Sequence, residues 1–290
     1  MAPSSLSGKS VIVTGGGSGI GLAIVKYFAS QKSQVTILDI SKEAGLSILD
    51  SLQREHPGNK FLFKQCDISS WDEQKRVFEG VYRETGDIDI VVANAGISER
   101  GNFLSRDSGE PEKPNLTTLD VDLTGTLYTI KLAIHYMRKK STAQKGTIIC
   151  TASNAGIYPF PIAPLYATSK HAVIGAVRSL ARPLSPEGIQ INGLAPAVIG
   201  SFSSQVPKID KSTDNKAETN IAPDKALFAN MIITPMSTIV AAVEEFVSKP
   251  EHNGIIAEIS GDRFTFRDPP EYVDENTGKN IENFWQLGYA

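Results

Sequence analysis

Short apolar runs alternate along the chain with longer stretches in which apolar residues recur every three or four positions. The runs are continuous, as expected of strands covered on both faces, and the longer stretches have the spacing of amphipathic helices. Strands that alternate with helices predict βαβ units and a parallel sheet. The strand runs are 10–15, 34–40, 60–68, 88–96, 146–153, 189–196 and 254–260, and the helical stretches are 19–31, 41–55, 71–85, 116–140, 165–182 and 236–248.

This alternation predicts an α/β fold, a Rossmann-type doubly wound parallel sheet of about seven strands flanked by helices. The alternation is unbroken, so we expect a single domain over residues 1–290 with its core at about 6–260. The largely polar stretch at about 200–232 is typical of a functional lid or a disordered segment. Within it, the apolar stretch 226–233 predicts a lid helix, whereas the polar tail 261–290 matches no element.

The composition is that of an ordinary soluble globular protein, since 41% of the 290 residues are hydrophobic and 21% are charged. The net charge of −3 gives no basic excess that would favour nucleic acid or an anionic membrane. The N-terminal MAPSSLSGKS lacks an apolar leader segment, and no apolar run reaches the roughly 18 residues of a membrane span. We therefore expect a cytoplasmic protein.

The chain has two cysteines, Cys66 and Cys150, and each ends an apolar run. Two isolated cysteines in a chain of this length make neither a disulfide framework nor a metal site. We expect buried free thiols in a reducing compartment, and no metal.

A glycine-rich loop, TGGGSGIG at 14–21, connects the first predicted strand to the first helix. Glycines allow a tight turn there and bring backbone N–H groups close to a pyrophosphate at the helix N-terminus. The alternative is a flexible turn without a ligand, but the strand before it and the helix after it favour nucleotide binding. The expected contacts are Gly15, Gly17, Ser18, Gly19, Ile20 and Gly21.

Asp39 ends the second predicted strand, 24 residues after Gly15. A carboxylate at that place accepts hydrogen bonds from the ribose hydroxyls of NAD and repels the 2′-phosphate of NADP. The glycine loop contains no Arg or Lys, and the nearest cation downstream of Asp39 is Lys42. We therefore predict NAD as the cofactor. The alternative for Asp39 is a helix N-cap.

Two further strand ends are candidates for contacts to the cofactor. The third strand ends in CDI, where Asp67 is placed to reach the adenine amino group, and the fourth ends in ANAG, whose small residues let a cofactor lie close. Each signal is weak alone. The candidate residues are Ile40 after Asp39, then Cys66, Asp67, Ile68, Asn94, Ala95 and Gly96.

Tyr166 and Lys170 lie four positions apart in YATSK, and so on one face of the predicted helix. Ser153, thirteen residues before Tyr166, ends the fifth strand. A tyrosine has a pKa of about 10, so a neighbouring ammonium group is needed if it is to act as a base near neutral pH. These residues predict a proton transfer at Tyr166 coupled to a hydride transfer, with Ser153 bonded to the substrate oxygen.

The motifs TGGGSGIG, CDI, ANAG, YATSK and LAPAVIGS, with Asp39 and Ser153, resemble those of the short-chain dehydrogenase/reductase family in order over roughly 6–260. The resemblance implies a catalytic set of Ser153, Tyr166 and Lys170. It also implies that Tyr166 and Lys170 hold the cofactor and that Ile199 and Ser201 contact the nicotinamide amide. Within the family the chain looks most like 15-hydroxyprostaglandin dehydrogenase and fungal enzymes of secondary metabolism. A homodimer or homotetramer is implied as well.

Three positions depart from the family pattern. Asp122 stands where the family usually has an asparagine whose backbone carbonyl holds a proton-passing water, so we expect a catalytic contribution with slower or pH-shifted turnover. Ala197 replaces the usual glycine after Pro196, which should stiffen the base of the lid. Pro183 should kink or end the helix that carries Tyr166.

The segments expected to line the substrate pocket are 97–114, 154–164 and 200–230, and much of 154–164 is apolar. The only arginines in these segments are Arg100 and Arg106, and neither is placed to clamp a carboxylate. A hydrophobic, cyclic secondary alcohol or ketone therefore fits better than an acid, and we predict an NAD-dependent alcohol dehydrogenase or ketoreductase. The alternatives are a non-redox cyclisation or isomerisation on the same fold, and a nucleotide-binding regulator without chemistry.

Overall fold

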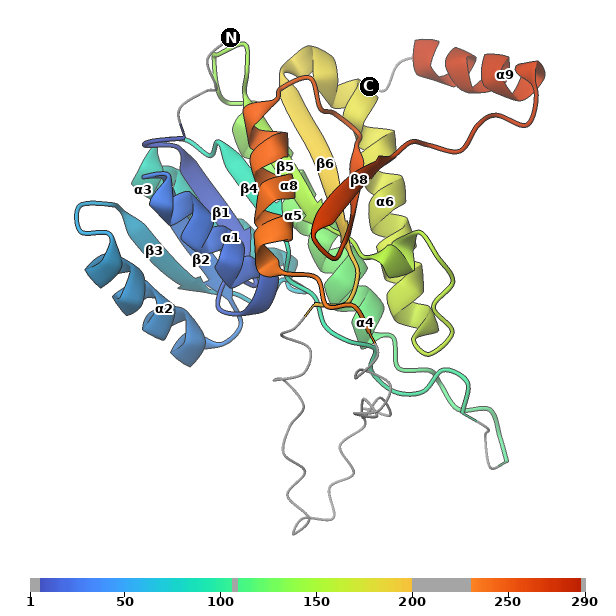
Figure 1. Cartoon of the computed structure of the whole chain (residues 1–290), viewed down its shortest axis with the longest axis horizontal. Helices are drawn as coiled ribbons and strands as arrows, with labels where there is room; N and C mark the ends of the chain where they lie inside the picture. Colours follow the sequence, from blue (N-terminus) through green and yellow to red (C-terminus); the bar gives the residue numbers. More distant parts are fainter. Residues whose placement is uncertain (1–5, 106–108, 200–230, 288–290) are drawn as a thin grey trace.

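One eight-stranded sheet runs through the centre of the protein (Figure 1). The computed structural model describes residues 6–105, 109–199 and 231–287. The strand order is β3-β2-β1-β4-β5-β6-β7-β8; all neighbours are parallel except β7 and β8, which are antiparallel. The strands are β1 Ser10–Thr14, β2 Gln34–Asp39, β3 Phe61–Gln65, β4 Ile90–Ala93, β5 Gly146–Thr151, β6 Ile189–Pro196, β7 Ile256–Ser260 and β8 Arg263–Arg267.

Helices cover both faces of this sheet, which confirms the prediction from the continuous apolar strands. Successive strand residues alternate between two cores: Ile12 of β1 packs on one face, and Val11 and Val13 pack on the other. The first core is shared with α3, α5 and α6, and the second with α1, α2 and α8. These helices are α1 Gly19–Ser30, α2 Lys42–Glu55, α3 Trp71–Thr85, α5 Thr126–Met137, α6 Pro164–Leu184 and α8 Met236–Ser248.

The predicted helix 116–140 is interrupted in the structure. It consists of α4 Thr117–Leu119, a π-helical segment η1 Asp120–Gly125, and α5. π-Helical turns inside helices occur often at functional sites, and this one contains Asp122. The helix that carries Tyr166 ends at Leu184, one residue after Pro183, and no helix of the described residues is long and apolar enough to cross a membrane.

The sheet has a topological switch point between β1 and β4. Strand β1 pairs with β2 on one side and with β4 on the other, so the chain turns in opposite directions from β1. Crevices outside the carboxyl ends of the strands at such a point are the ligand sites of open α/β sheets. The glycine loop after Thr14 and the ANAG segment after β4 both begin at this edge.

The C-terminal tail, which fits no element in the sequence analysis, contains β8 and α9 Glu275–Gln286. Phe264 and Phe266 of β8 pack against the core on the α8 face. Helix α9 lies apart from the sheet (Figure 1), and none of its residues is buried. Arg182 of α6 connects it to the body: its guanidinium bonds Glu282 at 2.7 and 2.5 Å and lies 5.2 Å from the Trp285 ring.

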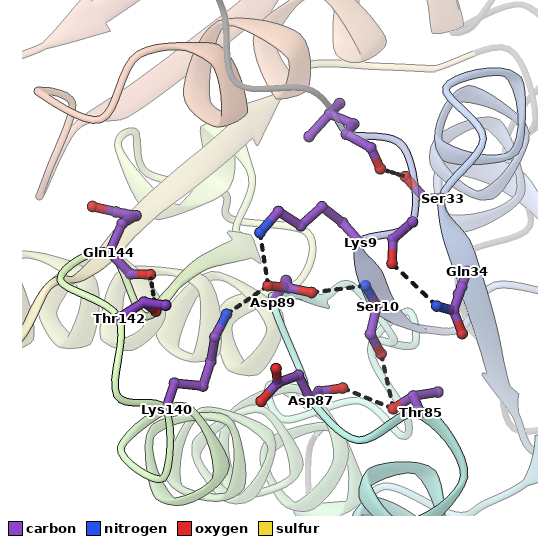
Figure 2. Close-up of polar contacts among 12 residues, drawn as sticks. Lys9, Ser10, Ser33, Gln34, Thr85, Asp87, Asp89, Lys140, Thr142 and Gln144 are labelled. Carbon is purple, nitrogen blue, oxygen red and sulfur yellow. Dashed lines mark hydrogen bonds and ion pairs between the residues drawn. The ribbon is translucent and has the colours of Figure 1, made fainter.

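At the amino ends of the central strands, Asp89 connects β1, β4 and the segment that follows α5. Figure 2 shows its carboxylate accepting hydrogen bonds from Lys140 at 2.5 Å, Lys9 at 3.1 Å and the backbone N–H of Ser10 at 2.9 Å. Burial alone would raise the pKa of Asp89, but the hydrogen bonds from Lys140 and Ser10 and the lysine charges hold it below its usual value. Asp89 is therefore a structural residue. It lies before the amino end of β4, whereas the glycine loop follows the carboxyl end of β1.

We predict that Asp89→Asn lowers the free energy of unfolding at pH 7 by about 1–3 kcal/mol, because Lys140 loses its charged acceptor. The folded-state pKa of Asp89 is depressed, so its contribution is complete above the unfolded pKa of about 3.9 and is lost as the pH falls through the lower folded value. Urea unfolding at pH 7 and below pH 4 should show the two proteins converging in acid. Asp50→Asn is the control, because Asp50 is exposed on α2. A difference in unfolding free energy between the wild type and Asp89→Asn that stays the same in acid would contradict this prediction.

Candidate active site

The glycine loop forms a tight turn between β1 and α1. Gly15 has φ +64°, in the left-handed region that favours glycine, and a Cβ there would lie 2.9 Å from the Ala95 Cα. A Cβ at Gly21 would lie 2.1 Å from the Gly15 carbonyl oxygen. The first turn of α1 has no acidic residue. Its N-terminus is therefore suited to an anion such as a pyrophosphate.

Thr14 fastens the glycine loop to the end of β4, a role that the sequence analysis missed. Its hydroxyl oxygen accepts hydrogen bonds from the backbone N–H groups of Asn94 at 2.9 Å and Ala95 at 3.0 Å. The Asn94 amide in turn donates to the Thr14 carbonyl at 3.0 Å, and its oxygen accepts from the Thr151 hydroxyl at 3.1 Å. The ends of β1, β4 and β5 are thus held in one hydrogen-bonded group.

Asp39 lies beside the glycine loop. One carboxylate oxygen accepts from the Gly17 backbone N–H at 2.9 Å, and the other accepts from the Ser41 N–H at 2.9 Å. The alternative that Asp39 caps α2 is wrong, because Ser41 is the N-cap and accepts from the Ala44 N–H. The neighbouring Ile40 is 64% exposed.

The CDI segment follows β3, and its first residue, Cys66, is buried. Asp67 accepts hydrogen bonds from the Ser69 backbone N–H at 2.9 Å and its hydroxyl at 2.7 Å, and the buried Ile68 packs against Gly125 of η1. Burial raises the pKa values of Cys66 and Cys150 to about 12. Both thiols are free and protonated at neutral pH, and the described residues contain no cluster able to hold a metal ion.

Tyr166 and Lys170 occupy successive turns of α6, and Ser153 follows β5. The Lys170 Nζ lies 5.3 Å from the centre of the Tyr166 ring and donates to the Thr151 carbonyl at 3.3 Å. The Ser153 hydroxyl caps the 3₁₀ turn η2 Asn154–Gly156. A Cβ at Gly156 would lie 2.6 Å from the Lys170 carbonyl oxygen, so this glycine lets η2 pack directly on α6. Ser153 and the Tyr-Lys pair therefore belong to one end of the sheet.

Asp122 is fully buried and faces Lys170 from η1. One carboxylate oxygen accepts from the Ile97 backbone N–H at 2.7 Å, and the other lies 3.2 Å from the Lys170 Nζ. Burial alone would lower the pKa of Lys170, but the negative charges of Asp122 and Tyr166 raise it above its usual value. Gly96 borders both groups, since a Cβ there would lie 3.2 Å from each of them. Lys170 is thus held as a buried cation.

An exposed aromatic side chain, Phe160, lies beside Tyr166. The Phe160 ring lies 6.4 Å from the Tyr166 ring. Tyr158, in the same loop, hydrogen-bonds Glu258 at 3.2 Å and receives a hydrogen bond from Arg267 of β8 at 2.7 Å. The C-terminal strand therefore supports this loop. The segments that follow β4, β5 and β6 contain the exposed apolar side chains Phe103, Leu104, Tyr158, Phe160, Ile162, Ile232 and Ile233.

Several predicted site residues lie outside this description. Ser201, Arg106 and most of the predicted lid are outside the described residues. Ile199 is described and forms an isolated bridge with Thr234, whose N–H bonds the Val198 carbonyl at 2.8 Å. Another residue near Tyr166, Glu99, was not predicted; its carboxylate accepts from the Tyr166 backbone N–H at 2.9 Å.

Comparison with known proteins agrees with this geometry. A family model described as short chain dehydrogenase matches residues 9–211. The short-chain dehydrogenase/reductase prx7 of Penicillium rubens is 28% identical over 276 residues, 88% of this chain and 93% of that protein. The 2,5-dichloro-2,5-cyclohexadiene-1,4-diol dehydrogenase of Sphingobium indicum is 34% identical over 214 residues, 74% of this chain and 80% of that protein. Levodione reductase shares the fold, with a TM-score of 0.72 at 24% identity over 88% of this chain and 97% of that chain.

Proposed function

This chain belongs to the short-chain dehydrogenase family, and we propose that it is an NAD(H)-dependent oxidoreductase that interconverts a secondary alcohol and a ketone. The observation that carries the proposal is the buried Lys170, held by Asp122 and lying 5.3 Å from the Tyr166 ring at the sheet edge that also bears the glycine loop. A regulator without chemistry would have no need of a buried cation beside a tyrosine, since burial of a charge is costly.

The residues of the glycine loop and of β2 fit a dinucleotide. The left-handed Gly15 and the α1 N-terminus would hold the pyrophosphate, and Asp39 would accept hydrogen bonds from the adenosine ribose. Asn94, Ala95 and Gly96 would border the nicotinamide half. When bound, NAD supplies the hydride acceptor for alcohol oxidation.

The protein side of the reaction is a proton transfer. Tyr166 accepts the proton of the alcohol hydroxyl, and the Lys170 ammonium favours its phenolate form by Coulomb attraction. The Ser153 hydroxyl donates a hydrogen bond to the substrate oxygen and fixes its position. Asp122 orients Lys170 toward Tyr166 and offsets part of its charge. Ketone reduction uses the same groups in reverse.

The apolar surroundings of Tyr166 support a neutral, hydrophobic substrate. Phe160 lies beside it, and both Phe160 and Ile162 of the same loop are exposed. A site for an acid would need a cation to pair with the carboxylate. The Sphingobium relative is named for a cyclic diol, which supports a cyclic alcohol here as well. We propose a cyclic secondary alcohol as the substrate class.

We predict that the protein binds NADH at least about ten-fold more tightly than NADPH, because the Asp39 carboxylate would repel a 2′-phosphate. Asp39→Ala combined with Ile40→Arg should reverse the preference, since it removes the repelling charge and adds a cation at an exposed position. Fluorescence titration of the wild type and the variant with each cofactor measures the change.

Ile40→Arg alone is the matched control. It should shift the preference less, because the negative charge of Asp39 stays beside the glycine loop and still repels the 2′-phosphate. Tighter binding of NADPH than of NADH by the wild type would show that the assignment of Asp39 is wrong.

A further inference from the structure

Glu99 is a buried carboxylate that the proposed reaction does not use. It is only 5% exposed, and one of its oxygens accepts a hydrogen bond from the backbone N–H of Tyr166 at 2.9 Å. Burial of an acidic side chain is costly unless its oxygens are bonded, so a residue kept there has a local reason. The contact is made to the residue whose side chain carries the proposed proton transfer.

The first turn of α6 depends on this contact. The helix begins at Pro164, which has no N–H, and its N-cap residue Ala163 has no side chain able to cap it. The Tyr166 N–H is one of the first backbone donors, which have no partner within a helix. Glu99 supplies the missing acceptor from a different part of the chain.

The backbone that carries Glu99 is itself fixed on both sides. The Ile97 N–H donates to Asp122 of η1 at 2.7 Å, and the Arg100 N–H donates to the Thr118 hydroxyl of α4 at 2.9 Å. The segment from β4 is therefore fastened to the same elements that hold Lys170. Through Glu99 it also fixes where the first turn of α6 begins.

We infer that Glu99 is a positioning residue for Tyr166: its hydrogen bond fixes the first turn of α6 and thereby the place of the Tyr166 side chain beside Lys170. This inference rests on the proposed role of Tyr166. A negative charge at the amino end of α6 opposes the helix dipole, which by itself favours an anion there. The bond and the charge are separable, since glutamine keeps an acceptor oxygen and loses the charge.

Other groups also act on Tyr166 from the elements packed around it. Lys170 on α6 favours the phenolate, Asp122 on η1 offsets Lys170, and Cys150 on β5 lies near Lys170 and is protonated. His171, on the following position of α6, has its Nδ1 at the Ala167 carbonyl. The place of Tyr166 relative to Lys170 therefore decides how strongly these groups act on the phenol.

The test is an NMR spectrum at neutral pH of the full chain labelled with ¹³C at the tyrosine ζ carbon, with the Tyr166 signal identified by its loss in Tyr166→Phe. In Glu99→Gln this signal should stay close to its wild-type position, because glutamine keeps an acceptor oxygen for the Tyr166 N–H. In Glu99→Ala the signal should shift or broaden, because the hydrogen bond is gone.

Asp274→Asn is the matched control, because Asp274 caps the exposed helix α9 through the Thr277 N–H at 2.7 Å and lies outside the site; it should leave the Tyr166 signal unchanged. An unchanged Tyr166 signal in Glu99→Ala would overturn the inference. The readout needs neither substrate nor cofactor. A failure of the proposed function would appear instead as absent NADH binding with these shifts intact.

Discussion

Tyr166→Phe is expected to lower kcat by about 10²–10⁴-fold and to leave the affinity for NADH within about two-fold of the wild type. The substitution removes the phenolate oxygen that accepts the substrate proton. The ring that remains still packs near Phe160 and beneath the Lys170 ammonium, so the site keeps its shape. Steady-state turnover of a cyclic secondary alcohol with NAD, paired with an NADH titration, separates the loss of chemistry from a loss of binding.

Tyr158→Phe is the control for this substitution. It also removes a tyrosine hydroxyl at the substrate end of the molecule, but one that bonds Glu258 and Arg267. We expect KM to rise, because the loop loses its support from β8, while kcat stays within a few-fold. Undiminished product formation by Tyr166→Phe would place the chemistry on another group and would favour the non-redox alternative.

Asp122→Asn is expected to move the acid limb of the pH profile of kcat to lower pH by about one unit. The buried Asp122 carboxylate lies 3.2 Å from the Lys170 Nζ and offsets part of the positive charge that favours the Tyr166 phenolate. Asparagine removes this negative charge and keeps an oxygen for the Ile97 N–H. Since one pH unit corresponds to about 1.4 kcal/mol, the shift is of the size expected for one charge at this range in a partly shielded site.

Asp122→Ala separates the charge from the hydrogen bond. It should show the same direction of shift, and it should cost about 1–3 kcal/mol more unfolding free energy than Asp122→Asn, because the Ile97 N–H is left without its acceptor. Equal pH profiles in the wild type and Asp122→Asn would mean that the charge of Asp122 has no influence on Tyr166. Kinetics from about pH 6 to 10 and urea unfolding at pH 7 measure both effects.

The strand pattern predicted most of the fold because its physical cause is local. Strands covered on both faces must be apolar throughout, and the seven predicted runs each contain a strand of the sheet. Strand β8 was missed because it spans only Arg263–Arg267, with Phe264 and Phe266 alternating with polar residues inside a polar tail. The break of 116–140 into α4, η1 and α5 has no sequence signature of its own, since π-turns form where packing requires them.

Residues of the candidate site that belong to short sequence motifs could be located from the sequence. The glycine loop and Asp39 lie side by side in the structure, and Tyr166 and Lys170 share one face of α6. Glu99 was missed because its partner is 67 residues away and no local spacing indicates the contact. Thr14 was part of a quoted motif, but its role depends on Asn94, 80 residues on. Contacts between strand ends become visible only when the sheet order is known.

In the proposed reaction, bound NAD would accept a hydride from the alcohol carbon while Tyr166 takes the hydroxyl proton. The direct measurement is deuterium transfer from cyclohexanol, cis-cyclohexane-1,2-diol and α-tetralol, each deuterated at the carbinol carbon, to NAD, with mass spectrometry of the cofactor. We expect singly deuterated NADH from at least one alcohol. Its formation should be slowed by a primary isotope effect and abolished in Tyr166→Phe. Tight NADH binding with no deuterated NADH from any of these alcohols would contradict the proposed reaction.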